Sequence, residues 1–546
     1  MRDALDGEGA VDATTMTMVA DETLERLDAV VRQAMEHFNT PGTTLALTDG
    51  ERTLATRAYG YADIAAKTPA TPDHLFEIGS IGKSFTAIAL LQLREEGRVD
   101  FHAPVTDYLP WFSVPSEYDP ITIHHLLSHT SGMTGGTDFT PDQRFEVWSV
   151  RDVPVAHAPG EHFHYSNLGY KLLGLVLEHV EDRPYADIIQ QRILDPLGMK
   201  DTFPFITHDL RPRLAVGHAR MFDDRPSLPT HRLVPATWLE TNTGDGCIVS
   251  TAADMCIYLR MLLNDGRYLA GRILSEESFA LLTTPVIDAH GGAYAYGVDV
   301  QGPDGQRWIW HTGGMVGYVA VMCGDRDSRL GVILLVNGPG APRLLGDVAL
   351  RLLNAATAGD PLPDGLDLPD PFAVEDTGSL TGVFSGLERS FEIVADGNRL
   401  SLRDAGGTHP MRVAGENTFL VDAPGWDLFS ISVRREDNRP VEAIHGAEWF
   451  TTNAYDGPLT FDYPSEWDSY PGHYRSHNPW VSSLRVVLVK GQLRLIFSGS
   501  VDGFSGDGVL RPMPDGSFGV VEDGSIYDRV RFDTIVDGQA LRFHLS

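Results

Sequence analysis

The sequence Ile78-Gly79-Ser80-Ile81-Gly82-Lys83-Ser84-Phe85 runs into residues 86–93, which are apolar on nearly every side. A segment of this kind is typical of a buried helix. Ser80 and Lys83 stand three residues apart at the head of this helix, so their side chains share a face. A serine hydroxyl needs an adjacent base to become a nucleophile, and burial pushes a lysine toward its neutral amine form. The helix N-terminus also supplies N–H groups for a developing oxyanion, so the stretch predicts a serine nucleophile.

The use of lysine elsewhere in the chain supports this interpretation. The sequence contains five lysines beside 38 arginines. Most serine–lysine pairs at this spacing are surface accidents, but here a scarce lysine stands inside the most apolar predicted helix. We therefore favour the catalytic interpretation of S-x-x-K over the structural one.

The charge of the chain limits its partners. The formal net charge is −32 over 546 residues, which argues against nucleic acid and anionic membrane surfaces. Dense carboxylates beside scarce lysine favour a halophilic protein adapted to high salt, where screening tolerates them. A merely acidic mesophilic protein is the alternative. We expect a small molecule or a short peptide as the substrate, and the sequence leaves the oligomeric state open.

The start of the chain and its cysteines indicate a cytoplasmic location. The first nine residues are polar and acidic, unlike a signal peptide, and no apolar run approaches the roughly 20 residues of a membrane span. Residues 1–20 are expected to form a disordered tail. Three cysteines, an odd number without a C-x-x-C pair, favour buried free thiols over disulfides or a zinc site.

Two further motifs carry candidate site residues. Tyr165 and Asn167 stand two apart, so both can point the same way in an extended loop. A phenol can move a proton and an amide can hold a substrate carbonyl; ordinary turn chemistry before a helix is the alternative. Residues 308–315 are predicted as a strand running into glycines, which let a ligand approach closely. His311 lies in this strand, and the alternative interpretation is a histidine at a strand end that does not contact substrate.

Three histidines, at positions 124, 125 and 129, suggest a metal site. His125 and His129 have i, i+4 spacing, but no third ligand follows at the spacing of a zincin. The apolar pair Leu126-Leu127 between them favours a short packed helix that ends at a tight turn. We therefore expect no metal and no other cofactor.

Beyond the candidate site the composition changes. A proline-rich linker is predicted over residues 359–375, followed by alternating strands with Gly and Asp turns. We predict two small all-β barrels of lipocalin-like type, over residues 376–462 and 463–546. Residues 502–508 have the composition of a calcium loop, but they lack the EF-hand spacing and its terminal Glu, so a β-turn is favoured.

Taken in order, Ser80-Ile81-Gly82-Lys83, Tyr165-Ser166-Asn167 and His311-Thr312-Gly313 resemble the S-x-x-K, Y-x-N and H/K-T-G motifs of the class C β-lactamase and penicillin-binding family. The likeness covers roughly residues 21–357. It implies an α/β fold over residues 21–358, a central antiparallel sheet with a helical lobe, and an acyl-enzyme mechanism. Ser80 would attack a carbonyl while Lys83 and Tyr165 share the proton transfer, and which of the two is the base stays open.

The resemblance also implies binding roles. Asn167 would hold the substrate amide, Thr312 and Gly313 would line the substrate site, and the N–H groups of Ser80 and Gly314 would form the oxyanion hole. His311 stands where typical β-lactamases and carboxypeptidases carry a lysine that receives a substrate carboxylate, which a largely neutral histidine binds less well. With its C-terminal β-domains, the layout is most similar to the D-aminopeptidase branch, whose substrates present a free amine.

These observations leave three hypotheses for the function. The first is a serine hydrolase that cleaves amides or peptides containing a D-residue, in the manner of a D-aminopeptidase. The second is an esterase or weak β-lactamase on the same site, since an acyl-enzyme site accepts esters readily. The third is a ligand sensor that captures acyl groups with poor turnover, which stable acylation of Ser80 would reveal.

Overall fold

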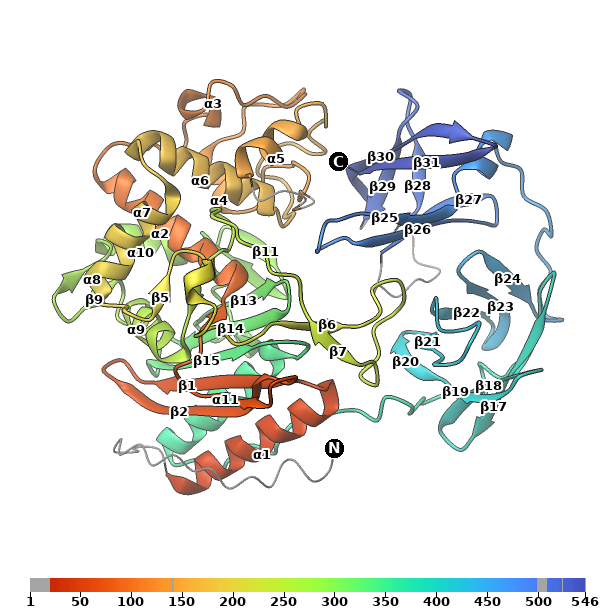
Figure 1. Ribbon diagram of the computed structural model, residues 1–546, viewed down its shortest axis with the longest axis horizontal. Helices are drawn as coiled ribbons and strands as arrows, with labels where there is room; N and C mark the ends of the chain where they lie inside the picture. The colour runs from red at the N-terminus through yellow and green to blue at the C-terminus, as the bar shows by residue number, and fades with distance from the viewer. Residues whose placement is uncertain (1–19, 137, 139–141, 498–507, 523, 546) are drawn as a thin grey trace. The chain divides into compact units, whose positions relative to one another are not determined.

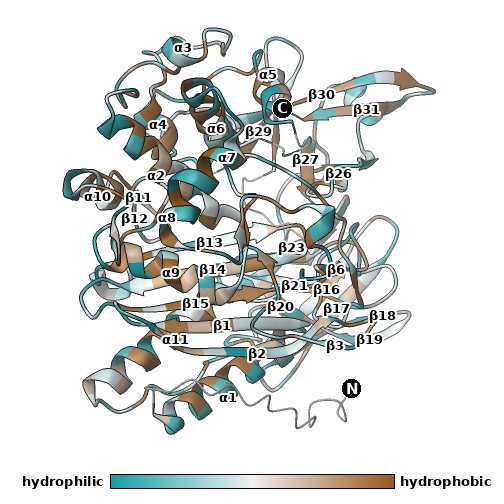
Figure 2. Cartoon of the chain, turned by 60° about the vertical axis from the view of Figure 1, so that its left-hand side comes forward, coloured by the Kyte–Doolittle hydropathy of each residue, from teal (hydrophilic) through white to brown (hydrophobic). Residues whose placement is uncertain are grey.

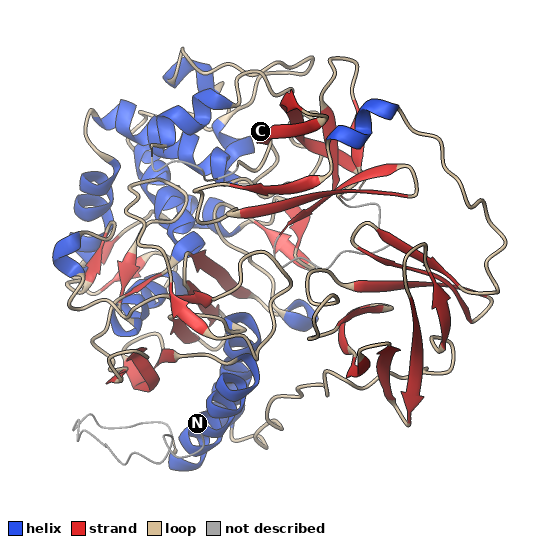
Figure 3. Ribbon diagram, turned by 45° about the vertical axis from the view of Figure 1, so that its right-hand side comes forward, coloured by secondary structure: helices blue, strands red, loops and turns tan. Residues whose placement is uncertain are grey.

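A computed structural model of the chain describes residues 20–136, 138, 142–497, 508–522 and 524–545. The chain divides into two compact units, one formed by Met1–Arg220 and Arg232–Asp367, the other by Met221–His231 and Leu368–Ser546. Helices are concentrated in the first unit, and strands dominate the second (Figure 3). The predicted tail, except for its last residue, and positions 502–507 of the predicted β-turn lie outside the described residues.

The first unit is built on a six-stranded antiparallel sheet with the order β13-β14-β15-β1-β2-β3. Its strands are β1 (Gly42–Thr48), β2 (Thr53–Asp63), β3 (Thr68–Pro69), β13 (Trp308–Met315), β14 (Tyr318–Asp325) and β15 (Leu330–Val336). A hairpin with Asp49-Gly50 in its turn joins β1 to β2. Every residue of β1 and β15 is buried, so the middle of the sheet is covered on both faces (Figures 1 and 2).

Helices cover the two faces of this sheet. Gly346 of α11 (Pro342–Ala358) lies against Val321 of β14, whereas Gly324 of the same strand lies against Leu263 of α9 (Ala252–Leu263). Because residues of opposite parity on a strand point to opposite faces, α11 and α9 cover opposite sides. The amphipathic helix α1 (Asp21–Phe38) packs against α11.

A helical lobe completes the first unit. Its centre is α2 (Gly82–Glu95), which packs against α6 (Asn167–Glu181), α7 (Tyr185–Ile189) and α10 (Glu276–Thr283). Eleven of the fourteen residues of α2 are buried, which confirms the helix predicted from its apolar sequence. Two short helices, α4 (Ile123–Leu127) and α5 (Gln143–Ser149), pack on α6. Their side chains join α2 and the sheet in one hydrophobic core.

The larger part of the second unit is a nine-stranded antiparallel sheet with the order β19-β18-β17-β16-β24-β23-β22-β21-β20. Its strands are β16 (Gly382–Ser385), β17 (Ser390–Asp396), β18 (Arg399–Asp404), β19 (Gly407–Pro410), β20 (Arg412–Gly415), β21 (Thr418–Leu420), β22 (Ile431–Glu436), β23 (Arg439–His445) and β24 (Glu448–Thr451). The two edge strands, β19 and β20, are separated by Met411 alone, so the sheet curls into a nearly closed barrel. Aromatic rings, among them Phe384, Phe391, Trp426 and Phe450, fill its interior.

Two smaller sheets form the rest of the second unit. One contains β25 (Gly472–Arg475), β26 (Ser483–Val489) and β27 (Gln492–Phe497), and the other contains β28 (Leu510–Pro512), β29 (Phe518–Glu522), β30 (Ser525–Val536) and β31 (Gln539–Leu545). A bridge between Arg494 and Val509 connects them, and their apolar faces share one core. Met221–His231, inserted between β6 (His218–Arg220) and β7 (Leu233–Pro235) in sequence, packs within this unit.

The fold class predicted from sequence is confirmed: a β-lactamase-like α/β domain is followed by an all-β region. The proposed boundary between two barrels at residues 462 and 463 stays a prediction, as do the linker bounds. Cys247, Cys256 and Cys323 are buried and free, as predicted. Among the residues the structure describes, no helix is long and apolar enough to cross a membrane.

Candidate active site

Ser80 lies on a 3-10 turn, η2 (Gly79–Ile81), directly before α2. Gly79 in this turn has a φ of +53°, and a Cβ atom there would lie 2.5 Å from the Gly314 nitrogen. Both observations require glycine, because a side chain would strain the backbone and collide with β13. The turn that carries Ser80 therefore packs directly against the end of β13.

Lys83 points from the first turn of α2 toward Ser80. Its Nζ lies 3.0 Å from Ser80 Oγ, 2.7 Å from Asn167 Oδ1 and 2.8 Å from the Asp245 carbonyl oxygen. Two of these three partners can only accept, so a neutral amine would donate both of its N–H groups to them and turn its lone pair toward Ser80. Burial lowers the pKa of Lys83 to about 8, against the charges of Asp245 and Asp138, which raise it.

Tyr165 and Asn167 flank the residue that caps α6. The Ser166 side chain accepts a hydrogen bond at the helix N-terminus, so Tyr165 lies outside the helix and Asn167 is the first helical residue. The Tyr165 ring centre lies 4.8 Å from Lys83 Nζ. Burial raises the pKa of Tyr165, although its interaction with the Ser80 side chain opposes this.

The third motif lies on β13, beside the Ser80 turn. A Cβ atom at Gly313 would lie 1.8 Å from the Ile78 carbonyl oxygen, so glycine is required for this contact. His311 is 3% exposed, and burial lowers its pKa to about 4. Its Nδ1 faces the Thr312 carbonyl oxygen, which can only accept, so the neutral ring carries its proton there. The Tyr294 hydroxyl then donates to His311 Nε2 at 3.3 Å.

The structure therefore brings Ser80, Lys83 and Asn167 into one hydrogen-bonded group, with the Tyr165 ring and the strand of His311, Thr312 and Gly313 alongside. Gly314, the other predicted oxyanion donor, has open space where a side chain would stand.

The three neighbouring histidines have separate environments. His124 is hydrogen-bonded to the Tyr296 hydroxyl, and His125 caps its own short helix, α4. His129, with a φ of +57°, is buried, and its Nδ1 accepts from the Ser166 backbone N–H. Within the described part of the chain, no three or more His, Cys, Asp or Glu side chains are arranged to hold a metal ion.

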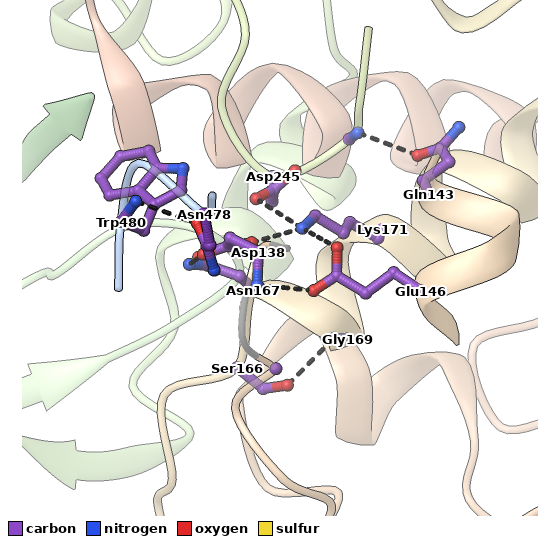
Figure 4. Close-up of polar contacts among 12 residues, drawn as sticks. Asp138, Gln143, Glu146, Ser166, Asn167, Gly169, Lys171, Asp245, Asn478 and Trp480 are labelled. Carbon is purple, nitrogen blue, oxygen red and sulfur yellow. Dashed lines mark hydrogen bonds and ion pairs between the residues drawn. The ribbon is translucent and has the colours of Figure 1, made fainter. Parts of the chain in front are cut away.

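Sequence reasoning missed a buried charged cluster beside Asn167 (Figure 4). Lys171 of α6 forms ion pairs with Asp138 and with Glu146 of α5, and lies 3.9 Å from Asp245. Asp138 also accepts from Asn167 Nδ2 at 2.9 Å. One signal was present: Lys171 is a scarce lysine in an apolar helix, the same argument that identified Lys83.

A second pair that sequence reasoning missed lies near Tyr165. His290 Nδ1 is 2.9 Å from Asp299 Oδ1, and the His290 side chain is 43% exposed while Asp299 is buried. The hydrogen bond to Asp299 raises the pKa of His290. The His290 ring centre lies 6.5 Å from that of Tyr165 and 5.3 Å from that of Phe163. This pair was not detectable from local sequence, because the two residues carry no motif.

Comparisons with known proteins agree with this geometry. The Beta-lactamase family model matches residues 27–356. Protein flp of Staphylococcus aureus (strain N315) is 25% identical over 356 residues, 62% of this chain and 68% of that protein. The octameric penicillin-binding protein homologue of Pyrococcus abyssi aligns with a TM-score of 0.56 and 25% identity, over 78% of this chain and 99% of that one.

A D-amino acid amidase of Ochrobactrum anthropi SV3 shares the fold, with a TM-score of 0.50 and 24% identity over 62% of this chain and 98% of that one. The family match covers more than half of the chain and includes all three motifs around Ser80. The chain therefore belongs to the β-lactamase family and has the hydrolase fold of the serine β-lactamases and penicillin-binding proteins.

Proposed function

We propose that this protein is a serine hydrolase that forms an acyl-enzyme on Ser80 and cleaves amide or peptide bonds in small substrates containing a D-amino acid. One observation carries the proposal: Lys83 Nζ lies 3.0 Å from Ser80 Oγ while two carbonyl oxygens take its remaining N–H groups. This arrangement supports a neutral amine that accepts a proton from the serine.

Acylation would begin with that proton transfer. As Lys83 takes the hydroxyl proton, Ser80 Oγ forms a bond to the substrate carbonyl carbon, and the carbonyl oxygen becomes negatively charged. The backbone N–H groups of Ser80 and Gly314 would stabilise this charge, each contributing about 3 kcal/mol to the lowering of the barrier. When the tetrahedral intermediate collapses, the C–N bond breaks and the leaving amine takes a proton.

The ionisation of the two candidate bases supports Lys83 as the base. Burial lowers the pKa of Lys83 to about 8, whereas burial raises that of Tyr165, so a phenolate is the less accessible form near neutral pH. Tyr165, which is protonated near neutral pH, would donate its proton to the leaving amine and then regain one from Lys83. In deacylation Lys83 would take a proton from water while the water oxygen bonds to the acyl carbon; the acyl–Oγ bond would then break, and Ser80 Oγ would take the proton back from Lys83.

The surroundings of His311 support an amine-bearing substrate. A buried neutral imidazole, held by Thr312 and Tyr294, offers no positive charge to a substrate carboxylate. Substrates whose recognition requires that charge are therefore disfavoured. The preference for a D-residue rests on the similarity of the motif set and the C-terminal β-region to the D-aminopeptidase branch.

The test compares hydrolysis of D-alanine p-nitroanilide, its L-enantiomer and p-nitrophenyl butyrate in molar salt. We expect D-selective amide cleavage that is lost in Ser80→Ala and in Lys83→Met. Ester cleavage alone would assign an esterase instead. A single acylation of Ser80 without product release would assign the sensor, and unchanged activity in Ser80→Ala would refute the assignment of the nucleophile.

A further inference from the structure

Lys171 is a second buried lysine, near enough to Lys83 for its charge to act on it. It follows Asn167 by four residues on α6, so the two side chains share a helix face. Its Nζ contacts Asp138 Oδ1, lies 2.8 Å from Glu146 Oε2, and is 3.9 Å from Asp245 Oδ2. Although burial lowers the pKa of Lys171, the charges of Asp245, Asp138 and Glu146 raise it above its ordinary value. Lys171 is therefore a fixed positive charge.

The Asp138 carboxylate connects this charge to Asn167. Its Oδ1 contacts Lys171, and its Oδ2 accepts from Asn167 Nδ2 at 2.9 Å. A carboxylate can only accept hydrogen bonds, so it fixes which end of the Asn167 amide faces it. The opposite end, Oδ1, must then face Lys83, where it lies 2.7 Å from Nζ.

On the basis of the proposed function, we propose that Lys171 and Asp138 are positioning residues. Lys171 holds the Asp138 carboxylate against Asn167. This contact orients the Asn167 carbonyl oxygen toward Lys83. A reversed amide would present an NH₂ group to the Lys83 amine, and the lone pair would no longer be directed at Ser80. The second Asn167 N–H stays available to a substrate carbonyl.

The same residues set the charge around Lys83. Asp245 and Asp138 favour its protonated form, and Lys171 opposes it. Other titratable groups that face Lys83 are His129, His311, Tyr165 and Tyr170. Removing Lys171 should therefore raise the pKa of Lys83, whereas removing the Asp138 charge should lower it. The two substitutions disturb one network but act on the base in opposite directions.

The experiment measures phosphonylation of Ser80 by a fluorophosphonate between pH 5 and 10, followed by mass spectrometry of the Ser80 peptide. In this reaction Oγ forms a bond to phosphorus, the P–F bond breaks, and the proton leaves to Lys83, so no natural substrate is needed. The variants are Lys171→Met and Asp138→Asn, with Lys200→Met, at an exposed position, as the matched control. A double variant, Lys171→Met/Glu146→Gln, removes one carboxylate together with the lysine. It keeps the test valid if Lys171→Met alone misfolds.

We expect the acid limb of the rate to move by about half a pH unit or more, upward in Lys171→Met and in the double variant, and downward in Asp138→Asn. The plateau rate should fall about tenfold or more in all three, because Asn167 is no longer held. Lys200→Met should match the wild type. If the acid limbs of the variants stay at the wild-type pH, or if those of Lys171→Met and Asp138→Asn move in the same direction, the positioning role is overturned. If the wild type is not labelled at Ser80, the proposed function itself fails.

Discussion

Two buried lysines show how partners decide the charge of a side chain. Lys83 is surrounded mainly by carbonyl oxygens, a hydroxyl and aromatic rings, and its pKa falls. Lys171, five residues after the Ser166 N-cap of α6, meets three carboxylates, and its pKa rises. Burial opposes the charge of both, so the difference comes from the number of negative charges within reach. The first lysine suits a base and the second suits a fixed counter-ion.

The rate of acylation should therefore follow the ionisation of Lys83. Its amine is unprotonated only above its pKa of about 8, so kcat/KM should rise with pH through that value. The measurement is a pH–rate profile between pH 5 and 10 in constant salt. A limb at lower pH that disappears in His290→Gln would show that a histidine, and not Lys83, is the base.

The pKa values of two histidines near Tyr165 should be shifted in opposite directions from the ordinary value of histidine. Burial lowers the pKa of His311 to about 4, so it should stay neutral from pH 5 to 8. The bond to Asp299 raises the pKa of His290, so its titration should lie above 6.5 and should move down in Asp299→Asn. NMR of ¹³C-labelled histidine, assigned with His311→Gln and His290→Gln, measures both. A His311 signal that titrates near pH 6.5 would contradict its buried neutral state.

These residues also show what the sequence could predict about the site. Ser80 and Lys83 were accessible because one helix start brings them together at a fixed spacing. Tyr165 and Asn167 were accessible because the resemblance supplied their partners. The contact of Lys171 with Asp138 joins segments 33 residues apart, and local periodicity carries no information about such a pairing. Only the scarcity of lysine pointed to Lys171.

At the scale of elements, the contact between η2 and β13 determines the geometry of the candidate oxyanion hole. Both Gly79 and Gly313 lie where any side chain would meet backbone atoms, whereas Gly314 has open space. The T-G part of the third motif thus has a steric cause: it lets the strand approach the turn that carries Ser80.

Gly313→Ala should separate these two elements. Its Cβ atom would lie 1.8 Å from the Ile78 carbonyl oxygen, so the backbone must move, at a cost of about 3 kcal/mol in the free energy of unfolding. Thermal unfolding and Ser80 labelling measure the effect, and both should fall. Gly314→Ala, one residue along, is the matched control and should unfold like the wild type. Equal stability of the two variants would refute the steric explanation.

Individual elements followed from local pattern more readily than their arrangement did. The apolar sequence of α2 predicted this helix directly, and Gly97, with a φ of +70°, follows its C-cap Glu96. The pairing of β1 with β15 joins residues from opposite ends of the first unit, for example Leu45 with Leu334. The assignment of Met221–His231 to the second unit was likewise not predicted, because nothing in the sequence of this segment indicates which residues it packs against.

At the scale of the whole molecule, the net charge of −32 should make stability depend on salt. Repulsion among carboxylates opposes the compact state, and salt screens it. Raising KCl from 0.1 to 2 M should therefore raise Tm by about 5 °C or more. Sucrose at matched osmolarity, which does not screen charge, is the control. A Tm that falls with KCl would show that ion pairs between arginine and carboxylates dominate instead.

The chain passes more than once between its two compact units, and Met221–His231 is the segment that interrupts the first. Within the second unit, the Asp223 carboxylate accepts from the two terminal guanidinium nitrogens of Arg475, at 2.9 and 2.8 Å, and from the Ser482 hydroxyl. Arg225 forms an ion pair with Asp427. All of these partners lie beyond residue 367, so the order of this short segment depends on chain that follows the β-lactamase-like domain.

A chain that ends at residue 367 should consequently keep the first unit folded but lose the order of Met221–His231. Chymotrypsin should cut after Phe222 much faster in this truncated chain than in the full chain, while labelling of Ser80 reports whether the first unit remains intact. Asp223→Ala/Arg225→Ala in the full chain is the matched variant, because it removes the ion pairs and keeps the second unit. It should be cut at an intermediate rate, since contacts of the segment with the second unit such as those of Asp224 with Arg485 and of Thr230 with Asp422 survive. Equal cleavage rates in all three proteins would show that the segment is held by its own local structure.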